Sequence, residues 1–161
     1  MSRSRAAVLP FTLRIAITNA WVSQLFDAEL GKRGVEPFQS GTLMVIHRHE
    51  PVTPSELHAV MGVPFTTLRN RVNELVRDGL VERVPNPQDG RSHLLRTTPR
   101  ADEVLKASNA AARQVQRLLA RHGVDVTAGL SDELDELRAV TRGLVNGDTS
   151  SGRGALTTGP W

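Results

Sequence analysis

The chain has 161 residues, enough for one domain to bury a hydrophobic core without metal or disulfide crosslinks. It has no cysteine, no apolar run long enough to span a membrane and no apolar stretch after its basic N-terminus, so we expect no thiol chemistry, no membrane span, no signal peptide and a cytoplasmic location. The formal net charge is +3, and only two of the twenty basic residues are lysines, so the positions of the arginines decide where a cationic surface forms.

The first part of the chain predicts two helices. Apolar residues recur at helical spacing from Phe11 to Gly31, with Trp21 in the stripe. A second helical pattern starts near Pro37 and stops at Pro51. An aromatic residue at helical spacing is typical of a core or a dimer interface, and Trp21 is also the candidate for lining an effector pocket.

Two shorter helical patterns follow, separated by a tight turn. Thr53, Pro54 and Glu56 form a complete helix-start signature, in which Thr is the N-cap and Glu lies three residues on. This helix ends at Gly62, and the next covers Phe65–Asp78. Two helices joined by a glycine-containing turn predict a helix-turn-helix.

The second helix of this pair is polar on one face and carries no acid between Phe65 and Asn73. Its apolar positions Leu68, Val72 and Leu75 occupy the opposite face. Thr, Asn and Arg can bond both phosphates and base edges, whereas an ordinary solvated face would mix in acids and lysines. We expect DNA to be contacted by Thr66, Thr67, Arg69, Asn70, Arg71 and Asn73, together with Ser55 of the preceding helix.

A β-hairpin is predicted next, with strands at Leu80–Val84 and Ser92–Thr97 and a turn over Pro85–Gly90. Arg91 follows the turn, where it can enter a DNA minor groove. Asp89 can brace the guanidinium by a charge-assisted hydrogen bond, so both residues are assigned to the DNA-binding site. The alternative is a surface ion pair with no role, and the position directly after a polar helix favours the DNA interpretation.

The C-terminal part predicts two more helices. Thr98 and Pro99 start a long one, and after Gly123 a last amphipathic helix begins near Ser131 and stops at Gly147. The polar residues beyond it predict a disordered tail. In the last helix the positions expected to face inward are Leu134, Leu137, Val140 and Leu144.

The stretch PSELHAVMGVPFTTLRNRVNELVRDGLVERVPNPQDGRSHLLRTTP resembles the winged helix-turn-helix of the MarR (multiple antibiotic resistance regulator) family. The carriers are Gly79–Val81, Asp89–Ser92 and the Thr-Pro pair after the wing. The resemblance runs from about Leu13 to Val145. It implies that the Phe65–Asp78 helix reads the major groove, that the wing arginine enters the minor groove, and that the first and last two helices interlock two chains.

One departure from the family concerns the start of the recognition helix. Pro64 and Phe65 stand where the family often has a capping Ser or Thr. We therefore expect another residue to supply the capping bond, and it stays open which of Thr66 and Thr67 touches a phosphate and which a base.

The resulting expectation is a mainly α, winged helix-turn-helix fold of about six helices plus a β-hairpin wing, dimerising through its N- and C-terminal helices. Its parts would be a flexible basic N-terminus (1–10), N-terminal helices (11–50), the DNA-binding region (51–98), C-terminal dimerisation helices (99–146) and the disordered tail (147–161).

The implied function is a sequence-specific transcriptional regulator, a repressor that binds a pseudo-palindromic operator in double-stranded DNA as a homodimer. By resemblance, a small, frequently phenolic, ligand releases it. A non-specific architectural DNA-binding protein and a winged helix for protein contact remain as alternatives. We find no catalytic constellation and no cofactor motif, and we interpret the five histidines as helix-end and surface residues rather than metal ligands.

Overall fold

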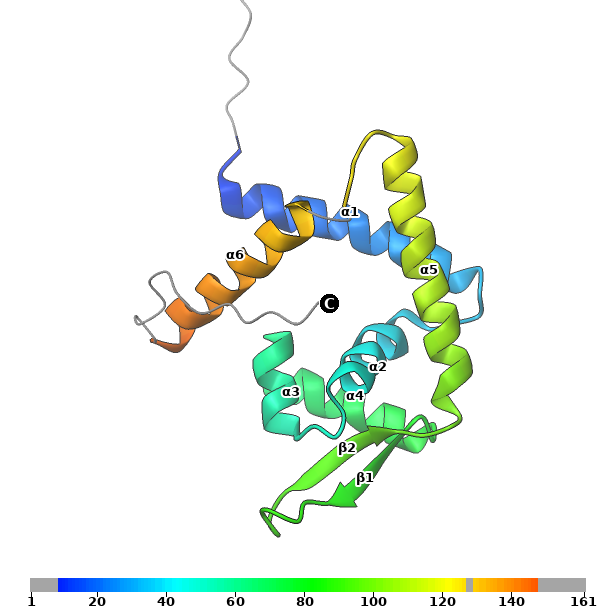
Figure 1. Cartoon of the computed structure of the whole chain (residues 1–161), viewed down its shortest axis with the longest axis vertical. Helices are drawn as coiled ribbons and strands as arrows, with labels where there is room; N and C mark the ends of the chain where they lie inside the picture. The colour runs from blue at the N-terminus through cyan, green and yellow to red at the C-terminus, as the bar shows by residue number, and fades with distance from the viewer. Residues whose placement is uncertain (1–8, 127–128, 148–161) are drawn as a thin grey trace, which may run out of the picture. The chain divides into compact units, whose positions relative to one another are not determined.

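A computed structural model of the chain describes residues 9–126 and 129–147. The described residues form six α-helices and a two-stranded antiparallel sheet, in the order that the sequence predicts (Figure 1). Most of the expected flexible N-terminus and nearly all of the expected disordered tail lie outside the described residues. The elements are α1 (Phe11–Gly31), α2 (Pro37–His49), α3 (Pro54–Met61), α4 (Phe65–Arg77), β1 (Val81–Pro85), β2 (His93–Thr97), α5 (Ala101–Arg121) and α6 (Gly129–Asn146).

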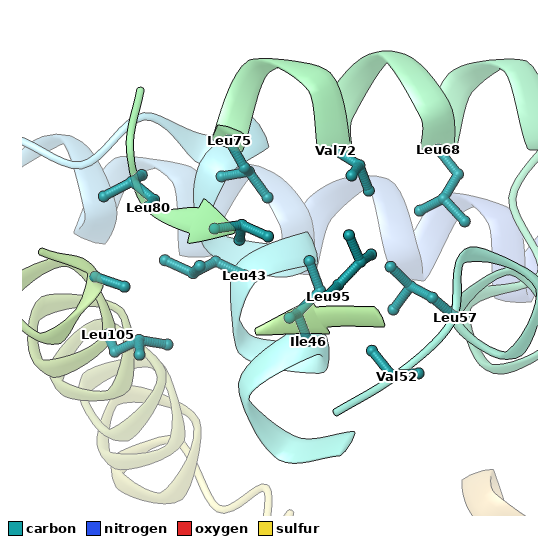
Figure 2. Packing of buried hydrophobic residues seen from close by; sticks show 12 residues of the cluster. Leu43, Ile46, Val52, Leu57, Leu68, Val72, Leu75, Leu80, Leu95 and Leu105 are labelled. Carbon is teal, nitrogen blue, oxygen red and sulfur yellow. The ribbon is translucent and has the colours of Figure 1, made fainter. Parts of the chain in front are cut away.

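The chain divides into two compact units, residues 1–115 and 116–161. The core of the first unit is a cluster of apolar side chains from α2, α3, α4, both strands and the start of α5 (Figure 2). Leu43, Ile46, Leu57, Leu75 and Leu95 are fully shielded from solvent. Burying each such side chain stabilises the fold by about 1.5–3 kcal/mol. The cluster thus fixes the apolar face of α4 against the other helices and leaves its polar face outside.

The sheet is a hairpin whose register runs from Val81 opposite Thr97 to Pro85 opposite His93. Both strands begin one residue later than predicted. Leu80 is not in β1, because its backbone N–H closes the end of α4 by donating to the Leu75 carbonyl. The hairpin is joined to the rest of the unit by a β-bridge, in which Val52 and Leu95 exchange backbone hydrogen bonds of 3.2 and 2.8 Å.

α1 is buried only near its C-terminal end, at Glu29 and Leu30. Glu29 accepts hydrogen bonds from Lys32 and from Arg33, and these bonds, the Lys32 one first, lower the pKa of its carboxyl. Leu30 packs with Val35 and Ala111 in a second small cluster. The preceding turns of α1 expose their large apolar side chains, which are Phe11, Leu13, Ile15, Ile17, Trp21 and Val22.

α6, in the second unit, corrects one prediction. Its apolar stripe was expected to face inward, yet no described residue of α6 is buried. Leu134, Val140 and Leu144 are 48%, 43% and 69% exposed, and Leu137 is half-buried. The physical reason is that periodicity marks a face suited to burial but does not supply a surface to bury it.

Candidate nucleic-acid interface

The helix-turn-helix is built around a fully formed capping box at the start of α3. The Glu56 backbone N–H donates to the Thr53 hydroxyl (3.2 Å), and the Thr53 N–H donates to the Glu56 carboxylate (2.8 Å). These hydrogen bonds, the backbone one first, lower the pKa of the Glu56 carboxyl. At the other end Gly62 adopts a left-handed conformation (φ 63°), which residues with a Cβ rarely adopt, so α3 stops there and the chain turns toward α4.

α4 presents its predicted polar face to solvent. Leu68, Val72 and Leu75 are buried, as expected from their spacing. The first turn contains no acid, and the N-cap residue Pro64 makes no side-chain capping bond. Five of the six predicted contact residues of α4 are exposed and the sixth, Arg71, is half-buried; the exposed ones are Thr66, Thr67, Arg69, Asn70 and Asn73.

Side-chain hydrogen bonds tie the C-terminal end of α4 to its surroundings. Asp78, its C-cap residue, accepts a hydrogen bond from the amide of Gln39 on α2 (3.0 Å). The Thr98 hydroxyl donates to the Gly79 carbonyl (2.6 Å) just beyond the helix. Because these bonds add to the apolar contacts of the buried face, the direction of α4 relative to α2 and to the wing is well defined.

Arg83 on β1 contacts the exposed face of α4, which the sequence did not predict. Its guanidinium donates to the Asn73 side-chain oxygen (2.6 Å), so the wing strand is bonded directly to the exposed face of α4. The Asn73 amide keeps its two N–H donors for a ligand, and its oxygen keeps a second lone pair. The burial pattern of β1 gives no signal for this contact, because Glu82 and Arg83 are both exposed and the strand does not alternate regularly at this point.

The wing tip is held by its own polar groups. The Asn86 amide donates to the Ser92 hydroxyl (2.7 Å), and the Ser92 backbone N–H donates to the Asp89 carbonyl (3.0 Å). Asp89 accepts from the backbone N–H of Arg91 (3.0 Å), not from its guanidinium. The prediction that the Arg91 guanidinium donates to Asp89 is therefore wrong. In a turn, the short side chain of Asp bonds to the backbone N–H two residues further on. Asp89 fixes the turn, and the exposed Arg91 side chain projects from it.

The base of the wing is fastened to the end of α2. The Glu50 carboxylate accepts hydrogen bonds from both the backbone N–H and the hydroxyl of Thr97, and it also bonds to the His47 ring (3.0 Å). The Glu50 cluster holds β2 at Thr97, its last residue, and the β-bridge to Val52 holds it at Leu95, its middle residue. The wing is therefore positioned by α2 as well as by its own turn.

The remaining predicted residues lie elsewhere in the first unit. Ser55 is exposed on the first turn of α3, next to the capping box. Trp21 is 67% exposed on α1, so it is not part of this chain's core. Within residues 9–126 and 129–147, no group of three or more metal-ligating side chains could hold an ion, and no helix is long and apolar enough to cross a membrane.

Comparisons with known proteins match the helix-turn-helix most directly. Residues 33–92 match the model of the MarR family. The multiple antibiotic resistance protein MarR of Escherichia coli strain K12 is 31% identical over 91 residues, a match that covers 56% of this chain and 63% of the relative. The protein of the same name from Salmonella typhimurium is 29% identical over 92 residues, covering 57% and 64%. The chain thus spans just under two thirds of the length of these curated relatives.

Solved structures extend the likeness to the flanking helices. Wild-type apo MarR from E. coli superposes with a TM-score of 0.62 at 25% identity, covering 86% of this chain and 98% of that one. A mutant E. coli MarR complexed with operator DNA superposes with a TM-score of 0.60 at 23% identity, covering 89% and 99%. In its helix-turn-helix, its wing and its mainly helical architecture, this chain is thus similar to regulators of the MarR family.

Proposed function

We propose that this protein is a transcriptional regulator that binds a specific operator in double-stranded DNA as a homodimer and represses transcription there. One observation carries the proposal. The helix-turn-helix presents a face of threonines, asparagines and arginines without an acid in its first turn, and a wing with an exposed arginine follows it. The relative of the same fold that has been solved with operator DNA supports this assignment.

In this proposal the contacts divide by chemistry. α4 enters the major groove, where Arg69, Asn70 and Arg71 read base edges, and Thr66 and Thr67 share the contacts to phosphate and base. Ser55 and Asn73 complete this set, and Asp89 acts by shaping the wing turn. The Arg91 side chain enters the neighbouring minor groove, where a narrow channel concentrates negative potential.

The homodimer is supported by the apolar surface left over in the single chain. Both α1 and α6 expose several large apolar side chains, whereas soluble monomers rarely expose large contiguous apolar patches. A second copy would remove them from water. The proposal therefore assigns residues 51–98 to DNA binding, and residues 11–50 and 99–146 to the core and the dimer. Acting on the chromosome, such a regulator would work in the cytoplasm.

A footprint on the operator tests this arrangement. A twofold dimer with one α4 per chain predicts two protected major-groove segments whose centres lie about 34–36 Å apart, one helical turn. Minor-groove protection by the wings should flank them. Protection spread evenly along the DNA would instead identify a non-specific architectural protein, and no protection at low salt would favour a winged helix used for protein contact.

Release by a small phenolic ligand is the regulatory part of the proposal, and the family resemblance supports it. Trp21 is exposed on α1 and is the residue we assign to the ligand, so its fluorescence gives a direct readout. Addition of a ligand that binds should change this emission and weaken operator binding together. Trp21→Phe should remove the ligand-induced change and leave the emission of the second tryptophan, Trp161. An operator affinity that no phenolic compound changes would contradict this part alone.

A further inference from the structure

Phe65, the first residue of α4, is an anomaly in the winged region. It is 47% exposed, and it is the only large hydrophobic side chain in the exposed class between residues 23 and 123, all of which the structure describes. Every other large apolar side chain in this stretch is at least half-buried. An aromatic ring left in water at one position, in a region that otherwise buries its apolar groups, suggests that the ring has a partner outside the chain.

The ring is held in place rather than free to turn inward. It packs against the edge of the His58 ring on α3, with ring centroids 5.6 Å apart and planes at 81°. His58 is itself fixed by a hydrogen bond between its Nδ1 and the Val63 carbonyl (2.8 Å). Edge-to-face contacts of this kind stabilise one orientation of an aromatic side chain. The turn of the helix-turn-helix therefore presents one flank of the Phe65 ring at the start of α4.

The surroundings of Phe65 indicate what it would meet. Thr66 and Thr67 follow it, Arg69 lies one turn along the same side of the helix, and the first turn has no acid. A single exposed ring among cationic and polar groups is too small a patch to dock a protein. The Phe65 ring is instead suited to pack on the 5-methyl group of thymine, which is the one apolar group on a base-pair edge in the major groove.

We propose that Phe65 reads a thymine in each half-site by packing on its 5-methyl group. This inference rests on the proposed function, because it assigns a residue of the same interface to a particular base. The residues at the N-terminal end of a recognition helix are those that contact base edges, which is where Phe65 lies. The contact distinguishes thymine from cytosine and uracil, neither of which carries the methyl.

The size of the effect follows from the area of one methyl group. Burying one such group is worth about 0.8 kcal/mol, which corresponds to about fourfold in affinity. If the methyl group is lost from both symmetric half-sites and the two losses are independent, the affinity should fall by roughly fifteenfold.

Uracil substitution in the operator tests the contact, because it removes the methyl and leaves base pairing unchanged. Each thymine of the operator half-site is replaced in turn by uracil in a fluorescent duplex, and the affinity is measured by anisotropy for the wild type and for Phe65→Ala. One position should weaken wild-type binding about fourfold, whereas Phe65→Ala should bind the thymine and uracil duplexes equally. Leu9→Ala removes an exposed apolar side chain outside the residues assigned to DNA and to the dimer, and it should keep the wild-type pattern.

The possible outcomes separate this inference from the proposed function. A wild type that prefers its operator over a scrambled duplex but tolerates uracil everywhere overturns the methyl contact and leaves the regulator intact. A uracil effect that persists in Phe65→Ala overturns it too. A wild type with no preference for any operator overturns the proposed function and the inference with it. The wild-type scan decides the matter even if Phe65→Ala fails to fold.

Discussion

Leu95, in the middle of β2, is the side chain through which the wing is joined to the core. It is fully buried, and it lies in the cluster formed by α2, α3 and α4 (Figure 2). Its backbone is held on one side by β1 and on the other by Val52. Replacing it with Ala removes the apolar contact while leaving these backbone hydrogen bonds in place.

The expected cost of Leu95→Ala is about 3–4 kcal/mol. Buried Leu→Ala changes cost about 2.7–5.0 kcal/mol, and the value depends on how far the site can collapse. Here β2 is hydrogen-bonded on both edges near Leu95, so it cannot move inward to fill the space. Since a domain of this size has a free energy of unfolding of about 5–15 kcal/mol, the variant should stay folded but lose a large part of that free energy.

Urea unfolding followed by circular dichroism measures this loss, with protein concentration held fixed because the stability of the proposed dimer would depend on it. For m near 2 kcal/mol/M, the midpoint should fall by roughly 1.5–2 M. Leu94→Ala is the matched control. It removes the same side chain one residue earlier, where alternation along the strand directs it to the other face and leaves it half-buried.

We expect Leu94→Ala to cost less than about 1.5 kcal/mol. Equal losses for the two variants would refute the reasoning, because they would mean that the face on which the side chain lies does not determine its contribution. A Leu95→Ala loss below about 1 kcal/mol would show that the wing is not anchored through this residue.

Three further predictions concern the interface, the capping box and the dimer. Arg91→Ala should weaken operator binding and lower its salt dependence by about one counterion per wing, as measured by anisotropy at several salt concentrations. Arg113→Ala, at an exposed position on α5, should change neither quantity. An unchanged affinity in Arg91→Ala would exclude the wing from the DNA interface. Glu56→Gln should destabilise the protein above the usual glutamate pKa of about 4.3. Because folding lowers the pKa of the Glu56 carboxyl, the stability it adds is present there and is lost as the pH falls through the lowered value, so the gap to the wild type in urea unfolding should close in acid; a gap that widens in acid would contradict the capping role. Leu144→Asp should produce monomers in light scattering, whereas Asn146→Asp, at an exposed position on the opposite side of α6, should not. A dimeric Leu144→Asp would exclude this part of α6 from the interface.

Local signals explain why the helices could be predicted well. The cap formed by Thr53 and Glu56 is a bond between residues three apart, so the sequence contains both partners. The buried face of α4 follows from Leu68, Val72 and Leu75, whose spacing matches the helical repeat. At these positions the local preference and the tertiary packing favour the same structure.

Contacts between distant positions could not be predicted. The bond from Arg83 to Asn73 depends on how the wing folds back beside α4, which neither element encodes alone. For Asp89, the sequence offers both the backbone N–H and the guanidinium of Arg91 as donors, and only the folded turn shows that the backbone N–H is used. The exposure of the apolar stripe of α6 could not be predicted, because its periodicity does not show what packs on that face.

The most direct test of the central claim is a titration of the full chain into two fluorescent duplexes at several salt concentrations. One duplex carries the DNA upstream of the protein's own gene, and the other carries the same bases scrambled. The account predicts nanomolar binding that favours the native duplex and saturates at two chains per site. Equal, strongly salt-dependent binding to both duplexes, or no binding to either at low salt, would contradict it.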